Sequence, residues 1–182
     1  MPGENGSEPS ELDRLLPEWH FRELHRVPVR GVATDRVMAA VHATTWGEAP
    51  LARALVALTR ADVSAGRRIV PDFLSTMGEV APSAEDEFLF VGAQAPGDTP
   101  RPPGTLLEIV TGCREPGILK VGMNVRYAQG VLSSETRILA TDERTRRVFA
   151  PYWYLIRAGS GLTRRSMLAA IRRRVLRESR RS

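Results

Sequence analysis

The chain has 182 residues, of which 42% are hydrophobic and 26% charged, and its formal net charge is +5. This length fits one domain of about 100–200 residues, and the composition is that of an ordinary soluble globule. The sequence contains no run of about 18 apolar residues, no signal peptide and a single cysteine, Cys113, so it predicts a cytoplasmic protein without a transmembrane helix or an intrachain disulfide.

The first regular pattern begins near residue 19. We expect residues 1–16 to be a disordered leader and residues 17–182 to form a single domain. Between Trp19 and Val29 the apolar side chains fall on odd positions, which is the pattern of a half-buried strand. Pro28 has no N–H and marks the end or the edge of this strand.

Two short amphipathic helices are predicted next. Thr34 or Asp35 can cap the first helix, and Gly47 ends it. Pro50 fits the first turn of the second helix. Neither helix is long enough to be stable alone, so both are expected to pack on a sheet.

After these helices the pattern becomes alternating. Five more strands are expected, at 73–80, 87–93, 105–111, 118–127 and 131–139. Residues 95–104 are rich in Pro and Gly and predict a polar surface loop. The Gln129-Gly130 step predicts a tight hairpin between the last two strands, because glycine tolerates positive φ.

A helical segment rich in arginine closes the chain. It is expected to begin at Asp142, to bend at Pro151 and to break at residues 158–161, after which a second helical segment follows. Residues 144–182 contain 12 Arg and one Glu, whereas the rest of the chain is acidic. A basic segment on an acidic body can recruit polyanions or dock on the body itself.

These elements predict an α+β fold, in which a curved antiparallel sheet wraps around a long C-terminal helix and two short helices follow the first strand. Three stretches carry a resemblance to known proteins: 120–127 (KVGMNVRY), 133–142 (SSETRILATD) and 149–161 (FAPYWYLIRAGSG). Over about residues 19–178 the chain resembles the helix-grip fold of the SRPBCC superfamily, and in particular uncharacterised actinobacterial members. That superfamily includes START lipid-binding domains, plant ligand-binding allergens and polyketide cyclase/dehydrase proteins. The resemblance implies a ligand cavity between sheet and closing helix, but it names no activity.

Strand alternation selects the side chains that would line this cavity. In 118–127 the odd set, from Leu119 to Tyr127, is apolar and is expected to face the helix, whereas the even set, with Lys120 and Asn124, is expected to face water. The residues expected to bind a small apolar or aromatic molecule are Phe90, Met123, Tyr127, Thr136, Tyr152 and Trp153. Simple core contacts between helix and sheet are the alternative role of the aromatic residues.

Two pairs of charged residues each allow two interpretations. Glu135 and Arg137 are either a solvated pair on the outer face or polar anchors inside the cavity. Glu23 and His25 share one face of the first strand and could form an acid/base pair for cyclisation or dehydration. Alternatively, they are rim residues at an open end of the sheet.

The remaining motifs identify no reaction. The histidines and Cys113 have no zinc-binding spacing and no phosphate loop is present, so neither a metal nor a cofactor is expected. The favoured function is binding of a small apolar molecule, with or without cyclase-like catalysis. The alternative is binding of an anion, a nucleic acid or a protein partner through the arginine-rich helix, although these arginines lack the aromatic residues and groove-entering motifs of nucleic-acid binders.

Overall fold

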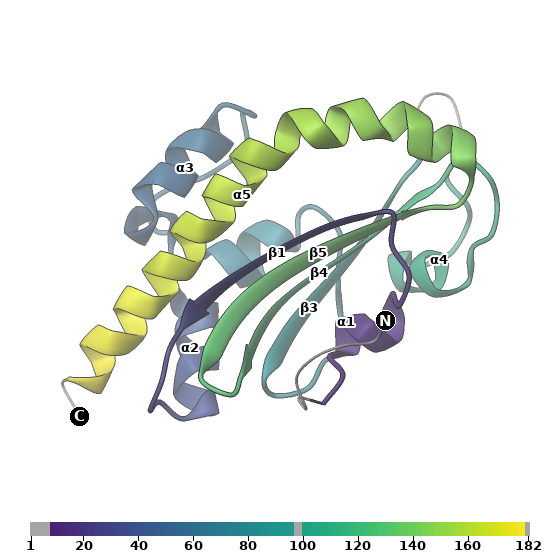
Figure 1. The fold of residues 1–182 in the computed structure, drawn as a ribbon. Helices are drawn as coiled ribbons and strands as arrows, with labels where there is room; N and C mark the ends of the chain where they lie inside the picture. The colour runs from purple at the N-terminus through teal and green to yellow at the C-terminus, as the bar shows by residue number, and fades with distance from the viewer. Residues whose placement is uncertain (1–7, 97–99, 181–182) are drawn as a thin grey trace.

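The core of the fold is a five-stranded antiparallel sheet in a computed structural model that describes residues 8–96 and 100–180. Its strands are β1 (Phe21–Pro28), β2 (Glu79–Ala81), β3 (Glu87–Gln94), β4 (Leu119–Ala128) and β5 (Val131–Ala140), in the spatial order β1-β5-β4-β3-β2. The sheet is not closed, so β1 and β2 are its edges. Figure 1 shows the long strands curving beneath the C-terminal helix α5 (Glu143–Ser179), which confirms the expected α+β fold.

Helices cover both faces of this sheet. They are α1 (Glu11–Leu15), α2 (Thr34–Ala43), α3 (Pro50–Ala57) and α4 (Leu106–Gly112), with a 3₁₀ turn η1 (Trp46–Glu48) and a π-helical turn η2 (Ile69–Phe73). α2 and α3 lie with α5 on the concave face, whereas α1 and α4 lie on the outer face (Figure 1). The two predicted helices after the first strand are therefore present.

The β4–β5 hairpin turns at the predicted place. Gln129 and Gly130 have φ angles of 52° and 75°, and Ala128 pairs with Val131 across them. Two consecutive residues with positive φ match the twist of the flanking strands, which favours this turn in hairpins. The register places the odd residues of β1 and β4 and the even residues of β5 on the concave face, toward α5.

The main core fills the space between this concave face and the helices. Leu168 and Ile171 of α5 belong to the same fully buried cluster as Val125 and Leu132 of the sheet. A separate aromatic cluster, with Phe21, Phe149 and Trp153, joins the first half of α5 to the sheet, and the Phe21 and Phe149 rings are 5.3 Å apart. Fully burying one such side chain stabilises the fold by about 1.5–3 kcal/mol.

Two of the predicted strands are wrong. Residues 105–111 form helix α4, in which Thr105 and Glu108 cap the first turn reciprocally. Most of 73–80 is η2 and a turn, and only residues from Glu79 onward pair with β3. A dense apolar run fits the period of a helix as well as that of a strand, and here the reciprocal cap favours the helix. Cys113 is half-buried at the C-terminal cap of α4.

The expected disordered leader is wrong for its second half. Residues 11–15 form α1, which Ser10 and Asp13 cap reciprocally, while residues 1–7 lie outside the described part of the chain. Leu12 and Leu16 are buried against the outer face of the sheet. A five-residue helix is unstable alone, so its order comes from this docking.

The outer face of β4 is covered, and the expectation that its even residues face water is therefore wrong. A methyl group on Gly122 would lie 2.6 Å from Cδ1 of Leu12, so α1 sits directly on the strand. Asn124 is 4% exposed and donates to Glu87, whose carboxylate also accepts the backbone N–H groups at the start of α1. Lys120 is buried on the same face.

Glu135 and Arg137 are neither a solvated pair nor anchors inside the helix-facing interior. Both lie on the outer face, where Nε of Arg137 donates to Oε1 of Glu135 at 2.6 Å and its Nη1 donates to the Leu16 carbonyl at 3.0 Å. Arg22 binds both oxygens of the Glu135 carboxylate, with Nε donating to Oε1 at 2.7 Å and Nη2 donating to Oε2 at 3.2 Å. The Trp19 ring stacks on the Arg137 guanidinium at 4.3 Å. This buried ion-pair network fixes the N-terminal segment to the sheet.

Helix α5 continues through the predicted break at 158–161. It is one helix of 37 residues that contains Pro151, and Figure 1 shows it bent between its two halves. Proline and Gly/Ser pairs are the usual causes of such bends, and both are present here. The glycines cost helix propensity, but Gly161 permits a close approach to β1 that a larger residue would prevent.

Candidate functional site

A cleft lies between the edge strand β1 and helix α5. Its volume is about 760 Å³, and it is open to solvent along the sheet edge. Its lining comes from four consecutive residues of β1 and from one face of α5: Arg22, Glu23, Leu24, His25, Tyr154, Arg157, Ala158, Gly161, Leu162 and Arg165. The first strand and the last helix therefore build the site together.

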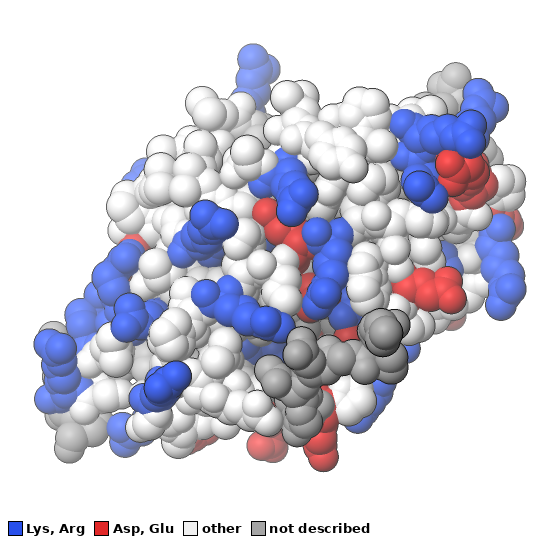
Figure 2. Space-filling model, in the orientation of Figure 1, with Lys and Arg blue, Asp and Glu red and all other residues white. Residues whose placement is uncertain are grey.

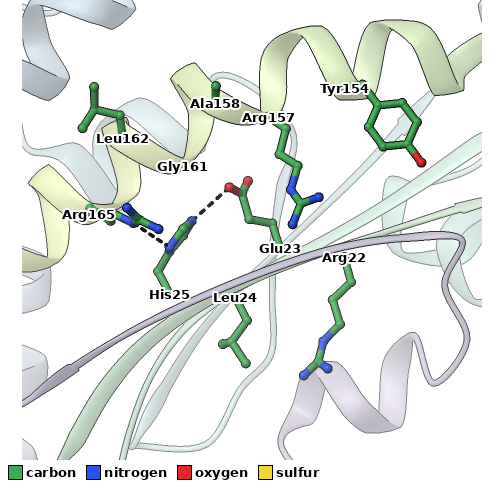
Figure 3. A pocket seen from close by; sticks show the side chains of 10 residues that line it. All are labelled: Arg22, Glu23, Leu24, His25, Tyr154, Arg157, Ala158, Gly161, Leu162 and Arg165. Atoms are coloured by element: carbon green, nitrogen blue, oxygen red, sulfur yellow. Dashed lines mark hydrogen bonds and ion pairs between the residues drawn. The ribbon is translucent and has the colours of Figure 1, made fainter.

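Strand geometry decides which β1 side chains enter the cleft. Figure 3 shows Glu23 and His25 rising from β1 toward α5, while Arg22 and Leu24 point to the other side of the strand. Tyr154 and Arg157 reach toward β1 from the helix. The cleft therefore holds an acid, an imidazole and cationic side chains beside an aromatic ring.

The acid and the imidazole form a dyad. Oε1 of Glu23 lies 3.0 Å from Nε2 of His25, and Oε2 of Glu23 accepts from Arg164 at 3.3 Å. These side chains are only 6%, 11% and 15% exposed, so the ion pair is largely withdrawn from water. Burial lowers the pKa of Arg164, and the negative charge of Glu23 opposes that shift. The predicted Glu23–His25 pair is thus brought into contact.

A second arginine defines the tautomer of His25. Nε of Arg165 lies 3.4 Å from Nδ1 of His25. Because arginine can only donate, Nδ1 is the acceptor and Nε2 carries the proton that goes to Glu23. A carboxylate on one imidazole nitrogen and an unprotonated acceptor on the other is the arrangement of a positioned general base.

Gly161 brings the helix down to this dyad. A Cβ atom at this position would lie 2.6 Å from Oε1 of Glu23 and 3.3 Å from Nε2 of His25. Any side chain here would displace the carboxylate. The glycine that the sequence pattern suggested as a helix breaker is a contact point between α5 and β1.

Two hydroxyl groups lie beside the dyad on the neighbouring strand. Ser134 of β5 is opposite His25, and Thr136 is opposite Glu23, with their side chains on the same face. Neither side-chain oxygen has a hydrogen-bond partner among the described residues, although both residues are buried. Buried unpaired hydroxyls are uncommon and mark places where a ligand or water can bind.

The six predicted ligand residues do not line one pocket. Phe90, Met123 and Tyr127 are part of the main core, and the hydroxyl of Tyr127 lies 2.7 Å from the Val29 carbonyl oxygen. Thr136 lies next to the dyad, and Trp153 belongs to the aromatic cluster.

Tyr152 is 54% exposed and borders a smaller cleft of about 350 Å³ beside Leu119. Of the aromatic residues of α5, Trp153 makes the core contacts of the alternative interpretation, whereas Tyr152 does not lie in the core.

Sequence reasoning missed the helix side of the cleft. The contribution of Arg164 depends on a contact across 141 residues, which no local pattern shows. The available signal was Gly161 followed by two arginines one turn later on α5, since a small residue in a helix often marks a close approach.

The arginines of α5 serve several roles. Arg174 and Arg177 bind the carboxylate of Glu48, and Arg173 donates to the Glu48 carbonyl. Figure 2 shows basic side chains gathered along α5, with acidic atoms between this helix and β1. Part of the basic face therefore docks on the body of the protein itself.

Residues 8–96 and 100–180 contain no group of three or more His, Cys, Asp or Glu residues that could hold a metal ion. None of the helices in this part of the chain has the length and apolar character needed to cross a membrane.

No protein-family model matches the chain, and neither a curated protein nor a solved structure shows significant similarity to it. The resemblance to the SRPBCC superfamily accordingly stays an expectation.

Proposed function

We propose that the protein binds an organic anion with an apolar part in the cleft between β1 and α5. The observation that carries this proposal is the charge of the lining. Arg157 and Arg165 face the opening, whereas Glu23 is already held by Arg164. Among the described residues, the Arg157 side chain makes no ion pair or hydrogen bond, and that of Arg165 makes only its long contact to His25.

The apolar part of the ligand has its own surface. Tyr154 is 69% exposed and Leu162 is 42% exposed, and both line the cleft. Binding sites combine such surfaces with a few placed polar groups, and an aromatic face beside a guanidinium suits an aryl or alkyl carboxylate. This placement differs from the expected cavity, because it lies at the β1 edge of the sheet and not over the central strands.

The dyad adds a chemical capability to binding. When Arg165 turns toward a ligand carboxylate, Nδ1 of His25 is free to accept a hydrogen bond or a proton from a ligand hydroxyl. Glu23 holds the opposite nitrogen and stabilises the resulting imidazolium, and Arg164 fixes Glu23. This is the acid/base role that the first-strand pattern suggests, with His25 as base and Glu23 as the group that orients it.

The test compares a charged ligand with its neutral isostere. Titration calorimetry with cinnamate and cinnamamide should show that the carboxylate binds at least tenfold more tightly, since a charge-assisted hydrogen bond contributes about 1.5–3 kcal/mol. Arg165→Gln should remove most of this difference. The control is Arg172→Gln, an exposed residue of α5 outside the cleft. Equal binding of acid and amide, or equal effects of the two substitutions, would refute the proposal.

A further inference from the structure

We propose that the anion bound in this cleft is an extended peptide segment with acidic side chains, which adds to the sheet as a strand along the free edge of β1. This inference rests on the proposed function, because it names the class of anion. Its first support is the backbone of the edge strand.

The hydrogen bonding of β1 leaves alternate residues unpaired. The N–H of Val29 donates to the Gly130 carbonyl at 2.8 Å, one step beyond the last strand pair, Pro28 and Val131, and in phase with the β1–β5 register. In an antiparallel pair every second residue repeats this pattern, so the odd residues of β1 bond to β5. The N–H and C=O groups of Arg22, Leu24 and Arg26 therefore point away from the sheet.

These backbone groups border the cleft. The side chains of Arg22 and Leu24 turn away from α5 (Figure 3), so the parts of these residues that line the cleft are their main-chain atoms. Within the described residues, no side chain forms a hydrogen bond with the main-chain N–H or C=O groups of Arg22 or Leu24. A row of unpaired donors and acceptors at a sheet edge is a template for another strand.

The other edge of the sheet is protected and this one is not. β2 has only three residues, and short edge strands are a common defence against unwanted pairing. β1 has eight residues, and its proline, Pro28, blunts only its last position. The long open edge coincides with the cleft, as expected for an edge that is used in recognition.

The dimensions of the two walls match a short peptide. From Arg22 to Arg26, β1 extends for about 13 Å at about 3.3 Å per residue. From Tyr154 to Arg165, α5 rises about 16 Å at 1.5 Å per residue. A strand of about five residues fits both lengths, and an edge strand facing a helix provides main-chain bonds on one wall and side-chain contacts on the other.

The cationic residues set the spacing of the acidic side chains. Arg157 and Arg165 are eight residues apart on α5, which corresponds to about 12 Å along the helix. In an extended peptide, residues i and i+4 lie on the same face and about 13 Å apart. A peptide with glutamates at its first and fifth positions can therefore place both toward the two arginines.

The experiment uses blocked five-residue peptides and the full-length protein. The probe has glutamates at positions one and five with valines between them, and the control of equal composition has its glutamates at positions two and four. In fluorescence anisotropy the probe should bind at least tenfold more tightly than the control, because the control has an inter-glutamate spacing of only two residues. Equal affinity would overturn the proposed spacing.

Two further comparisons test strand pairing itself. Two variants of the probe are compared, one N-methylated at its odd residues and one at its even residues. Only one of these two sets of N–H groups faces β1, so only one of the two peptides should lose binding. Leu24→Pro removes an edge N–H and should weaken binding at least tenfold while a melting curve shows that the fold persists. If that variant does not fold, the N-methylated peptides decide. Equal losses from both N-methylated peptides would overturn the inference.

Measuring cinnamate and the probe peptide on the same protein distinguishes failure of the peptide proposal from failure of the anion-binding function on which it rests. Binding of cinnamate that depends on Arg165, without any binding of the probe peptide, would leave the anion site intact and overturn the peptide. Loss of both would overturn both.

Discussion

Two glycines in the same helix should respond oppositely to the same substitution. A methyl group on Gly159 meets no atom within 4 Å, whereas on Gly161 it meets the Glu23 carboxylate. Alanine is favoured over glycine in a helix interior by about 0.8–1.0 kcal/mol. Gly159→Ala should therefore raise the free energy of unfolding by about that amount, and the Tm by about 2–4 °C.

Gly161→Ala gains the same propensity but loses a contact. The new Cβ would lie 2.6 Å from Oε1 of Glu23, where ordinary contact begins at 3.4 Å, so the carboxylate must retreat by about 0.8 Å. That movement breaks its 3.0 Å contact with His25. Losing one hydrogen bond to a charged group costs about 1.5–3 kcal/mol, so this variant should be less stable than the wild type by about 0.5–2 kcal/mol.

Urea denaturation of both variants measures the difference directly. The free energies of unfolding of the two variants should differ by about 1.5–3 kcal/mol. Both variants gain the same helix propensity, so the difference reports only the lost hydrogen bond. Adding Glu23→Gln to each variant provides the control. The double variant with Gly161→Ala should lose less than the sum of the single changes, since both act on one contact. If both glycine variants are equally stabilised, α5 does not approach β1 as described.

Three further changes test the parts of the fold that support the site. Leu12→Ala should lower the free energy of unfolding by about 2–5 kcal/mol in urea denaturation, because this residue is fully buried between α1 and the sheet; a loss below 0.5 kcal/mol would mean that α1 is not docked. Tyr127→Phe removes the hydroxyl that serves a buried carbonyl and should cost about 1–2 kcal/mol, while exposed Tyr152→Phe should cost nothing measurable by the same assay. The Thr145 hydroxyl and backbone N–H groups lower the pKa of Asp142, the cap of α5, from 3.8 to about 2. Its ionised form therefore stabilises the protein above pH 3.8, and this contribution is lost as the pH falls toward 2, so the Tm gap between wild type and Asp142→Asn should shrink over that interval; a gap independent of pH would contradict the cap.

Local sequence patterns predicted the parts of the fold that depend on interactions between residues close together in the chain. The alternation in β1 placed Glu23 and His25 on the helix-facing side, and the Gln129-Gly130 step located the hairpin because both facts depend on neighbouring residues. The apolar run in α4 fits either period, and the reciprocal cap of Thr105 and Glu108 was the readable signal for a helix. The burial of the outer face depends on α1, which is ordered only through distant contacts.

The candidate site was only half predictable for the same reason. Its strand wall follows from alternation, but its helix wall follows from the distance between α5 and β1. That distance is set by Gly161, and nothing near Gly161 in the chain indicates which strand it meets. The six residues expected to bind a ligand were chosen for facing the helix, and most of them form the core there, because helix and sheet meet closely over the main core.

The pairing of the first strand with the last has a consequence during synthesis. β1 pairs only with β5, which ends at Ala140, so on the ribosome the first strand waits unpaired while more than a hundred residues are made. Pairings between segments so distant in the chain form late and slowly. The cleft needs α5 as well, so a nascent chain has no binding site, and its exposed first strand is the segment that a chaperone would have to shield. The site can therefore appear only after α5 has been synthesised.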